Sequence, residues 1–544
     1  ARAISWVGDN GGTGNGTTWG RTVSMLMLPL PYVVAFSPPT HAHQPTTAPN
    51  MNGAYELSKT PGAPTGASFP TNFKDYPGGV ESFDVYHGPI TTQYSQVWWA
   101  STSNPLPDDI VRRFNGSAIA IVGLEMDQVR RTPQGDVSVP INVAYNHHHD
   151  TAVVGKGAHL VEVERDDPRF VKAGRKHIRL SGMKAWVAEE HAPSASGLPT
   201  SAMFSDGNGG EYRKSFHAYA PPYAQIVESP AALAGAPMSI DTWNRDEMDL
   251  GGGPFVPGPY PKAALAPRAG PDAIYSGLLE CPLTSRVAKL HDSNDTRIPF
   301  GKGSGYLQYI PTGEKVRFPA DRCLPYPRET VLEQRNPSCD LRTYAGGLVS
   351  CHHGWHLLDA EQAIPWTDKP LVFYKKFRIY FQPYNASWHK QVERQDWGIA
   401  ADGDRSEYDV APCAPATPEP ACRKTITGTW MPVAAGSTPK YLLAVHHHCH
   451  APTCLAMEIW NHDTGALLCR QRVVYGGRRG DDESRFDEPG YIATPPCLWG
   501  SREHGLETPP LMNGVTIRVV ALTNTSYGHH GEMALPEVTL GPAP

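Results

Sequence analysis

The sequence lacks any apolar stretch long enough to cross a bilayer as a helix. Its most apolar run, residues 25–36, is short and contains Pro29 and Pro31, whereas a membrane-spanning helix needs about 20 mostly apolar residues. It also lacks an excess of positive charge, because 48 Lys and Arg residues stand against 54 Asp and Glu, for a formal net charge of −6. Since a phosphate backbone is bound by a basic surface, we expect neither a membrane span nor a nucleic-acid partner.

Cysteine is missing from the first 280 residues, and all 10 cysteines follow from Cys281 onward. An even number of cysteines in a loop-rich chain fits disulfide bonds and an oxidising compartment. Cys413 and Cys422 bracket a proline-rich loop and form one candidate pair. Five Asn-x-Ser/Thr sequons are candidate glycosylation sites, at Asn15, Asn115, Asn294, Asn385 and Asn524. Together these features predict a secreted, extracellular glycoprotein.

Several catalytic signatures are absent. The chain has no His-Glu-x-x-His motif, no Gly-x-Ser-x-Gly motif and no phosphate-binding loop, so the sequence offers no support for a zincin, a serine hydrolase or a nucleotide-dependent enzyme. Residues 206–208 and 402–404 resemble the start of a calcium loop, but neither completes its 12-residue pattern.

Long helices are also excluded by composition. The 53 prolines and 52 glycines are far above average usage, and no long stretch has apolar residues at helical spacing. The clearest strand patterns are 117–129, 139–149, 158–164, 371–384, 441–450, 454–460, 466–475 and 514–524. Residues 461–465, Asn-His-Asp-Thr-Gly, predict a hairpin turn between two of them. The sequence therefore predicts an all-β protein with two jelly-roll-like antiparallel β-sandwich domains.

Changes of composition divide the chain into four parts. Residues 1–80 are rich in Pro, Gly, Ser and Thr and predict an extended N-terminal arm. Residues 81–250 form the N-terminal β-sandwich, 251–345 a linker and cysteine-containing insert, and 346–544 the C-terminal β-sandwich.

What the chain has in abundance is histidine, in three dense runs. Residues 146–150 are Asn-His-His-His-Asp, 351–353 are Cys-His-His, and 446–450 are His-His-His-Cys-His. A lone Met533 follows the last run. Imidazole binds first-row transition metals well, whereas a thioether is soft and favours Cu(I). Two histidine clusters and one methionine therefore predict two copper sites of unequal character, and with them redox chemistry.

Strand geometry favours a metal site in the last run. Side chains alternate across a strand, so a strand ending at His450 would place His446, His448 and His450 on one face. A His-x-His pair on one face can bind one metal ion without bending the chain, and Met533 would add a third, softer ligand. The competing interpretation is a metal-free strand end with Met533 in a core, where most methionines lie.

The first run predicts a site made only of imidazoles. His147, His148 and His149 follow an apolar strand over 139–145, and two adjacent histidines can both reach a metal at a strand end, where the pleat loosens. Such a site needs a distant partner, and His217 is the best candidate in the same domain. The competing interpretation is that His217 is simply packed beside its aromatic neighbours.

The short middle run leaves three alternatives open. His352 and His353 could join one of the metal sites, form a third site, or lie beside a disulfide at Cys351. The last of these alternatives, in which the two histidines lie beside a disulfide and bind no metal, is favoured.

At these residues the chain resembles the copper type II, ascorbate-dependent monooxygenases. This family includes peptidylglycine α-hydroxylating monooxygenase and dopamine β-hydroxylase, and the dopamine-hydroxylase-like proteins of algae and other protists are more similar still. The resemblance covers roughly residues 85–245 and 347–544, and it lies in the order of the motifs. It implies two jelly-roll-like domains that each hold one copper ion across a solvent cleft. The longer histidine runs and the segments 1–80 and 272–345 depart from the family pattern.

The resemblance also implies which residues bind the two ions. The first copper is then held by His147, His148 and His217, with His149 as an alternative. The second is held by His448, His450 and Met533, with His446 and His448 as an alternative register.

The implied function is a monooxygenase that draws electrons from ascorbate and hydroxylates a C–H bond of a small-molecule or peptide substrate, with dioxygen binding at the methionine-containing copper. The alternative is an extracellular structural or filament-forming glycoprotein that keeps the fold, with the N-terminal arm mediating self-assembly by wrapping or pairing with a neighbour. A third hypothesis is a histidine-rich metal-storage protein.

Overall fold

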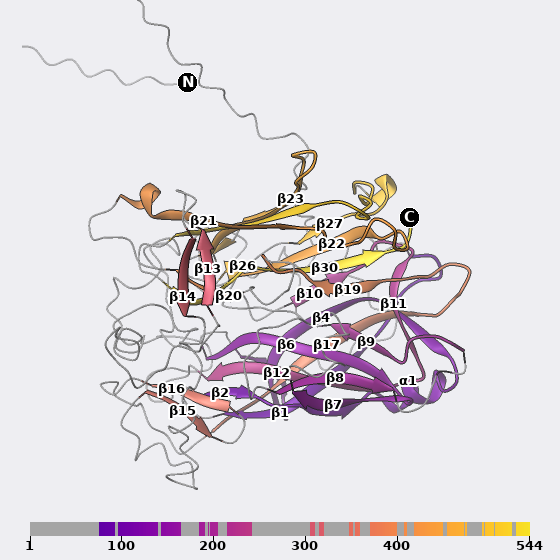
Figure 1. The fold of residues 1–544 in the computed structure, drawn as a ribbon. Coiled ribbons are helices and arrows are strands. Elements are labelled where there is room, and N and C mark those ends of the chain that lie inside the picture. The colour runs from indigo at the N-terminus through magenta and orange to yellow at the C-terminus, as the bar shows by residue number, and fades with distance from the viewer. Residues whose placement is uncertain are drawn as a thin grey trace, which may run out of the picture. The chain divides into compact units, whose positions relative to one another are not determined.

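The computed structural model describes segments that all belong to the second of two compact units, Ala42–Pro544. The described residues are 76–92, 96–139, 143–164, 184–190, 194, 196–204, 215–241, 305–309, 315–319, 347–351, 354–358, 370–399, 407–410, 418–449, 454–472, 474–475, 492–493, 496–504, 506–524 and 529–544. Most of them lie in β-strands that pair in antiparallel sheets (Figure 1). The all-β prediction, which rested on proline, glycine and short alternating strands, is confirmed.

Two seven-stranded sheets enclose the first hydrophobic core. The first sheet contains β1 (Glu81–Thr92), β17 (Leu371–Pro383), β4 (Ala118–Thr132), β11 (Tyr223–Glu228) and β18 (Lys390–Gln391) in that order, with β10 (Ser215–Ala218) and β5 (Gly135–Ser138) also paired to β4. The second contains β15 (Gly347–Cys351), β16 (Gly354–Leu358), β2 (Gln96–Trp99), β12 (Pro230–Asp241), β6 (Ala144–Gly155) and β9 (Ser201–Phe204), with β3 (Thr102–Pro105) paired to β12. Inward-facing side chains of both sheets, such as Ile121, Phe377 and Val153, fill the space between them.

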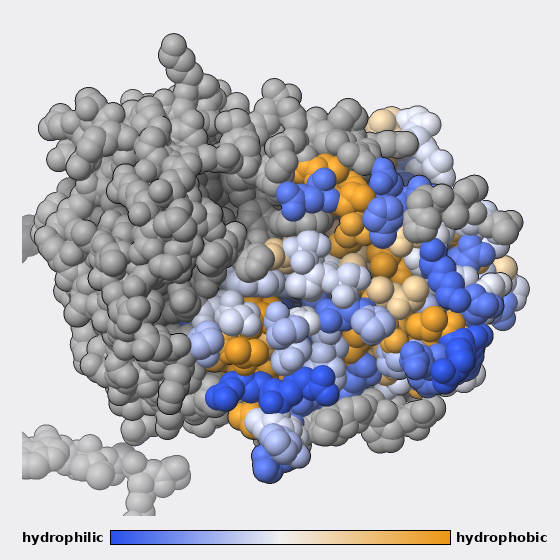
Figure 2. Space-filling model, turned by 90° about the horizontal axis from the view of Figure 1, so that it is seen from below, coloured by the Kyte–Doolittle hydropathy of each residue, from blue (hydrophilic) through white to orange (hydrophobic). Residues whose placement is uncertain are grey.

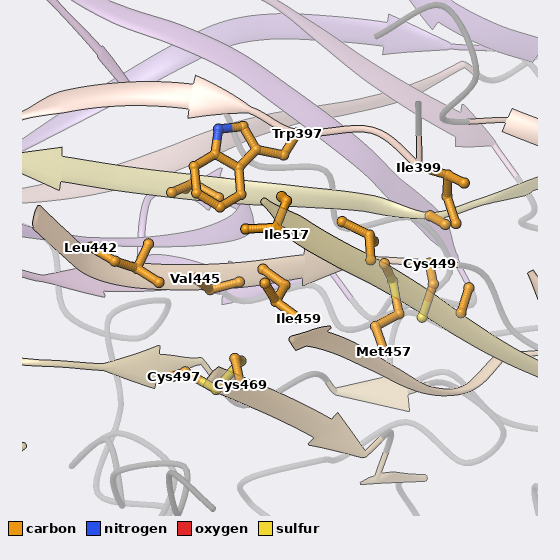
Figure 3. Close-up of a cluster of buried hydrophobic side chains, with 14 of the residues drawn as sticks. Trp397, Ile399, Leu442, Val445, Cys449, Met457, Ile459, Cys469, Cys497 and Ile517 are labelled. Carbon is orange, nitrogen blue, oxygen red and sulfur yellow. A yellow bond between two sulfur atoms is a disulfide. The ribbon is translucent and has the colours of Figure 1, made fainter. Parts of the chain in front are cut away.

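Two four-stranded sheets enclose the second core. One contains β19 (Glu393–Asp396), β30 (Leu535–Gly541), β22 (Tyr441–His448) and β27 (Cys497–Leu498). The other contains β21 (Arg423–Trp430), β28 (Ile517–Asn524), β23 (Cys454–Asn461) and β24 (Leu467–Arg472). Figure 3 shows the buried side chains gathered between these strands, including Trp397, Val445 and Ile459. The predicted hairpin after Asn461 is confirmed, because β23 and β24 pair antiparallel.

The remaining elements are short. Four two-stranded pairs join β7 (Ala158–Glu164) to β8 (Lys184–Glu190), β13 (Gly305–Tyr309) to β14 (Lys315–Pro319), β20 (Glu407–Val410) to β29 (His529–Met533), and β25 (Val474–Tyr475) to β26 (Ile492–Ala493). The described helices are α1 (Asp108–Arg113) and the 3₁₀ turns η6 (Glu419–Cys422) and η8 (Arg502–His504). No described helix is both long and apolar enough to cross a membrane.

The first sandwich extends further along the sequence than composition predicts, because it includes β17. We expected the C-terminal sandwich to begin at residue 346, yet β15, β16 and β17 all pair with strands of the first sandwich. β17 runs between β1 and β4 (Figure 1), where Phe373, Phe377 and Phe381 are buried. The strands of the second sandwich begin only at β19. Local composition cannot show this, because it carries no information about which distant strand is the partner.

The outer face of the first sheet contacts the sheet that contains β22. The register of β22 against β30 shifts at Leu443, so Leu443 and Ala444 both turn away from the second core. Ala444 packs against the buried cluster that contains Ala120 and Tyr380, and Leu443 packs with Tyr223. The face of β22 that continues towards His448 is therefore the one turned to the first sandwich.

Two disulfides are present in the described part of the second sandwich, Cys449–Cys454 and Cys469–Cys497, which confirms the prediction of disulfide bonding. The candidate bond between Cys413 and Cys422 stays a prediction, because Cys413 lies outside the described residues.

The surface of the described residues is mixed in character. On the face shown in Figure 2, small hydrophobic patches are separated by hydrophilic side chains. Two sequon asparagines, Asn115 and Asn385, are exposed, as glycosylation requires. Asn524 lies in β28, whereas Asn15 and Asn294 lie outside the described residues.

Candidate metal centres

The first histidine run lies at an irregularity in the pairing of β6 with β12. Asn146 pairs with Ser239 and His148 pairs with Met238, which leaves His147 as the extra residue of a β-bulge. In a regular strand, neighbouring side chains point to opposite faces, but a bulge re-aims them. The rings of His147 and His148 accordingly lie 5.1 Å apart, centroid to centroid. The bulge therefore brings two consecutive imidazoles to one face.

This separation fits two ligands of one ion. An imidazole nitrogen lies about 2 Å from a first-row metal ion that it binds, so two rings on one ion have centroids within roughly 6 Å of each other. The ring of Tyr145 lies 5.9 Å from that of His147, on the same face, and His147 is only 7% exposed. The donors are thus two largely buried imidazoles beside an aromatic wall.

His149 lies on the opposite face of β6. It is fully buried in the sandwich interior, and its ring lies 5.3 Å from that of Phe377. The geometry therefore favours His147 and His148 as a pair and separates the alternative ligand His149 from them.

The third ligand expected for this centre is His217. Its backbone lies in β10, which pairs with β4 in the first sheet, opposite Leu124. The histidine pair belongs to the second sheet of the same sandwich. The side chain of His217 lies outside the described part of the chain.

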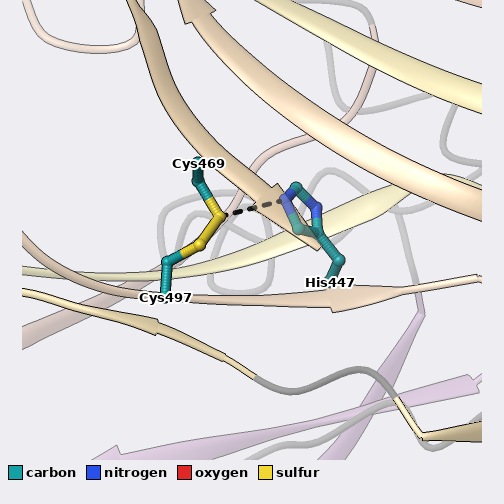
Figure 4. The surroundings of a disulfide bond; sticks show 3 residues. All are labelled: His447, Cys469 and Cys497. Carbon is teal, nitrogen blue, oxygen red and sulfur yellow. Dashed lines mark hydrogen bonds between the residues drawn. A yellow bond between two sulfur atoms is a disulfide. The ribbon is translucent and has the colours of Figure 1, made fainter. Parts of the chain in front are cut away.

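The last histidine run ends β22 with a regular alternation. His447 points into the second core, where its Nε2 lies 3.7 Å from the Sγ atom of Cys469 (Figure 4). His446 and His448 lie on the other face, 6% and 2% exposed. Residues two apart on a strand are spaced by about 6.6 Å, the spacing of the His-x-His pair that the sequence predicts. Of the two predicted registers, only the side chains of His446 and His448 are described, and the register with His450 stays a prediction, because His450 lies outside the described residues.

A carboxylate stands beside this second pair. Glu537 pairs with His446 across β30 and β22, and its Oε2 lies 3.9 Å from His446 Nδ1. Glu537 Oε1 binds the guanidinium of Arg394 at 3.0 Å, and Arg394 also binds Asp396 at 3.1 Å. Histidines that bind metals commonly give their other ring N–H to a carboxylate. Glu537 is therefore placed to orient His446 so that Nε2 is left for a metal.

The backbone register also places Met533 near the end of β22. Leu535 is the cross-strand partner of His448, and Met533 precedes it by two residues at the end of β29. β29 pairs with β20, where Glu407 is opposite Met533. The side chain of Met533 lies outside the described part, as do His352 and His353.

Among the described side chains, His, Cys, Asp and Glu form no group of three or more that could hold a metal ion. Each candidate centre therefore appears as a pair of imidazoles, and its expected third ligand is His217, His450 or Met533.

Burial controls the protonation of several nearby groups. Desolvation lowers the pKa of His447 to about 3, and repulsion from His446 acts in the same direction. The same cause raises the pKa of Glu125 to about 8, opposed by a hydrogen bond that Tyr380 donates to its Oε2 at 2.8 Å. At neutral pH, His447 is therefore a neutral imidazole and Glu125 holds a proton.

Two residues near the centres were not expected from the sequence. Glu537 has no local signal, because only its cross-strand partner His446 gives it a role. Lys375 had one: it is a lysine within the apolar strand 371–384, at a position that alternation would turn inward together with Phe373 and Phe377.

The chain matches no protein-family model, and no curated protein matches it. The resemblance to the copper monooxygenases therefore stays a prediction.

Proposed function

We propose that this protein is a secreted copper- and ascorbate-dependent monooxygenase that hydroxylates a C–H bond of a small-molecule or peptide substrate with dioxygen. The observation that supports this most is that the first and the last histidine runs each place two imidazoles on one face of a strand. A bulge brings together His147 and His148, and regular alternation brings together His446 and His448. Two separate sandwiches each carry one pair, as two mononuclear copper centres require.

The chain's own residues would hold two ions of different character. His147 and His148 offer only nitrogen donors. His217 is the third ligand that the resemblance implies, although it lies in the sheet from which this pair faces away. His446 and His448 offer nitrogen donors from β22, with Met533 adding a thioether that favours Cu(I). Copper bound there would supply one-electron redox chemistry and activate dioxygen, with ascorbate as the reductant. One oxygen atom would enter the substrate and the other would leave as water, which consumes two electrons and two protons.

Burial prepares both pairs for this role. All four imidazoles are buried or half-buried, so water competes weakly for the positions between them. At the second centre, Glu537 would accept the Nδ1 proton of His446 in a hydrogen bond after a small rotation of the ring, which fixes the tautomer that leaves Nε2 for the ion. Arg394 holds Glu537 from the other side.

The test combines copper content with ascorbate-dependent oxygen uptake of the purified chain. We expect two copper ions per wild-type chain, one ion in the double variant His147→Ala/His148→Ala, and one ion in His446→Ala/His448→Ala, with oxygen uptake lost in both. His462→Ala is the matched control, because His462 is an exposed turn histidine of the second sandwich. A folded wild-type chain that binds no copper would overturn the proposal, and filaments seen by electron microscopy in that case would favour the structural alternative.

A further inference from the structure

Lys375 is fully buried in the interior of the first sandwich, although nothing in the proposed chemistry uses a lysine. It lies on β17 between the inward-facing Phe373 and Phe377. Lysine is almost never fully buried without partners, because desolvating its ammonium group is costly. Its partners therefore show what it is for.

Its ammonium group bonds to the strands that form the bulge. Nζ donates to the side-chain oxygen of Asn146, to the backbone oxygen of His148 at 2.9 Å, and to that of Met238 at 3.4 Å. Met238 is the cross-strand partner of His148, and the register shifts between Met238 and Ser239. All three acceptors thus lie at the bulge that exposes the histidine pair on one face.

The chemistry of a bulge explains this contact. An extra residue interrupts the ladder of backbone hydrogen bonds, and buried carbonyls there still need donors. An ammonium group carries three donors and can serve these three oxygens. Lys375 reaches them from the opposite sheet, so it also fixes the distance between β17 and β6.

Lys375 belongs to a row of polar side chains across the first sheet. His87 and Gln128 are its cross-strand partners on β1 and β4. Gln128 Nε2 donates to the backbone oxygen of Ala144, at the start of β6. Gln128 therefore holds the start of β6 by a hydrogen bond to Ala144, and Lys375 holds the bulge by a hydrogen bond to His148, four residues later.

We propose that Lys375 is a positioning residue for the first candidate copper centre. By holding Asn146, His148 and Met238, it fixes the bulge that sets the rings of His147 and His148 side by side. This inference rests on the proposed function only in that the bound ion is copper.

The test is Lys375→Met in the full chain, because methionine keeps the length and removes the donors. We expect Cu(II) to bind 10- to 100-fold more weakly at the first centre, as on loss of a group that orients a metal ligand, with the affinity of the second centre unchanged. The matched control is Lys376→Met. Lys376 is equally buried, but it faces away from β6, towards Asp84 and Asp136. It should leave the first centre within about threefold of wild type.

A metal-free measurement separates this inference from the proposed function. Hydrogen exchange of the apo-protein should show lost protection at residues 146–149 in Lys375→Met and none in Lys376→Met. If wild type binds no copper, the proposed function fails, and the exchange result still decides the role of Lys375. Unchanged exchange and unchanged first-centre affinity in Lys375→Met would overturn the inference. Should that variant not fold, Asn146→Ala removes one acceptor and should weaken the first centre selectively; equal weakening of both centres would contradict the role.

Discussion

His87 should make the first sandwich lose stability in mild acid. It is fully buried, and its Nε2 lies 3.3 Å from the backbone oxygen of Thr102. Burial lowers its pKa to about 3, the charges of Lys375 and His149 act in the same direction, and the bond to Thr102 opposes them. Because the unfolded imidazole has a pKa of about 6.5, the unfolded chain takes up the proton first, and stability falls as pH falls from about 7 towards 3.

The size of this effect follows from the two pKa values. Between pH 7 and pH 5, a histidine that titrates near 6.5 when unfolded and near 3 when folded lowers the free energy of unfolding by about 2 kcal/mol. Replacement of His87 by leucine removes that pH dependence. The lost hydrogen bond also lowers the free energy of unfolding by about 1 kcal/mol at every pH.

The assay is urea unfolding of wild type and His87→Leu at pH 7, 6 and 5, followed by circular dichroism. The difference between the two proteins cancels the titration of other groups, such as His447. We expect the variant to be less stable than wild type at pH 7 and to gain about 2 kcal/mol relative to it by pH 5. A difference that does not change with pH would refute the assignment of a neutral, desolvated imidazole to His87.

Three further predictions concern the cores and the second centre. Phe377→Ala should cost about 3–5 kcal/mol of stability, because it empties a fully buried site between the two sheets; a thermal melt within 2 °C of wild type would contradict this. Replacing Cys469 and Cys497 with serine opens a loop with a sequence separation of 28 and should cost about 3–4 kcal/mol, measured by urea unfolding against the oxidised wild type; equal stability of the two proteins would contradict this. Met533→Ile nearly conserves side-chain volume, so the melting temperature should be preserved. Because the variant lacks the thioether, it should lose ascorbate-dependent oxygen uptake, and unchanged uptake would remove Met533 from the ligand set.

Local patterns were sufficient to place His446 and His448 on one face of a strand, but not to explain why His147 and His148 share one. The alternation of β22 follows from sequence alone, so the shared face of His446 and His448 was predictable. The choice between the registers 446/448 and 448/450 stays a prediction, because His450 lies outside the described residues. Glu537 was not predictable, since only the register of β30 brings it opposite His446.

The first centre depends on long-range pairing. The sequence predicted that two adjacent histidines could share a face where the pleat loosens, but the cause is a bulge against β12, some 90 residues later in the chain. A single sequence does not show which strands pair. The same limit explains the border near residue 346, since β17 has the alternation of any half-buried strand and only its partners assign it to the first sandwich.

The position of β17 in the chain also orders folding and metal binding. Lys375 and His148 are 227 residues apart in sequence, so the bulge gains its ammonium partner only after the first sheet has closed around β17. Such non-local pairing is slow. Before the strands have paired, the two imidazoles are not held side by side and bind a metal ion only weakly. We therefore expect copper to load onto a folded sandwich, unlike zinc in small domains that are unfolded without it. Metal-free protein should then show the circular dichroism and hydrogen-exchange protection of the loaded protein in β4, β6 and β17. Loss of protection in these strands on removal of copper would contradict this order of events.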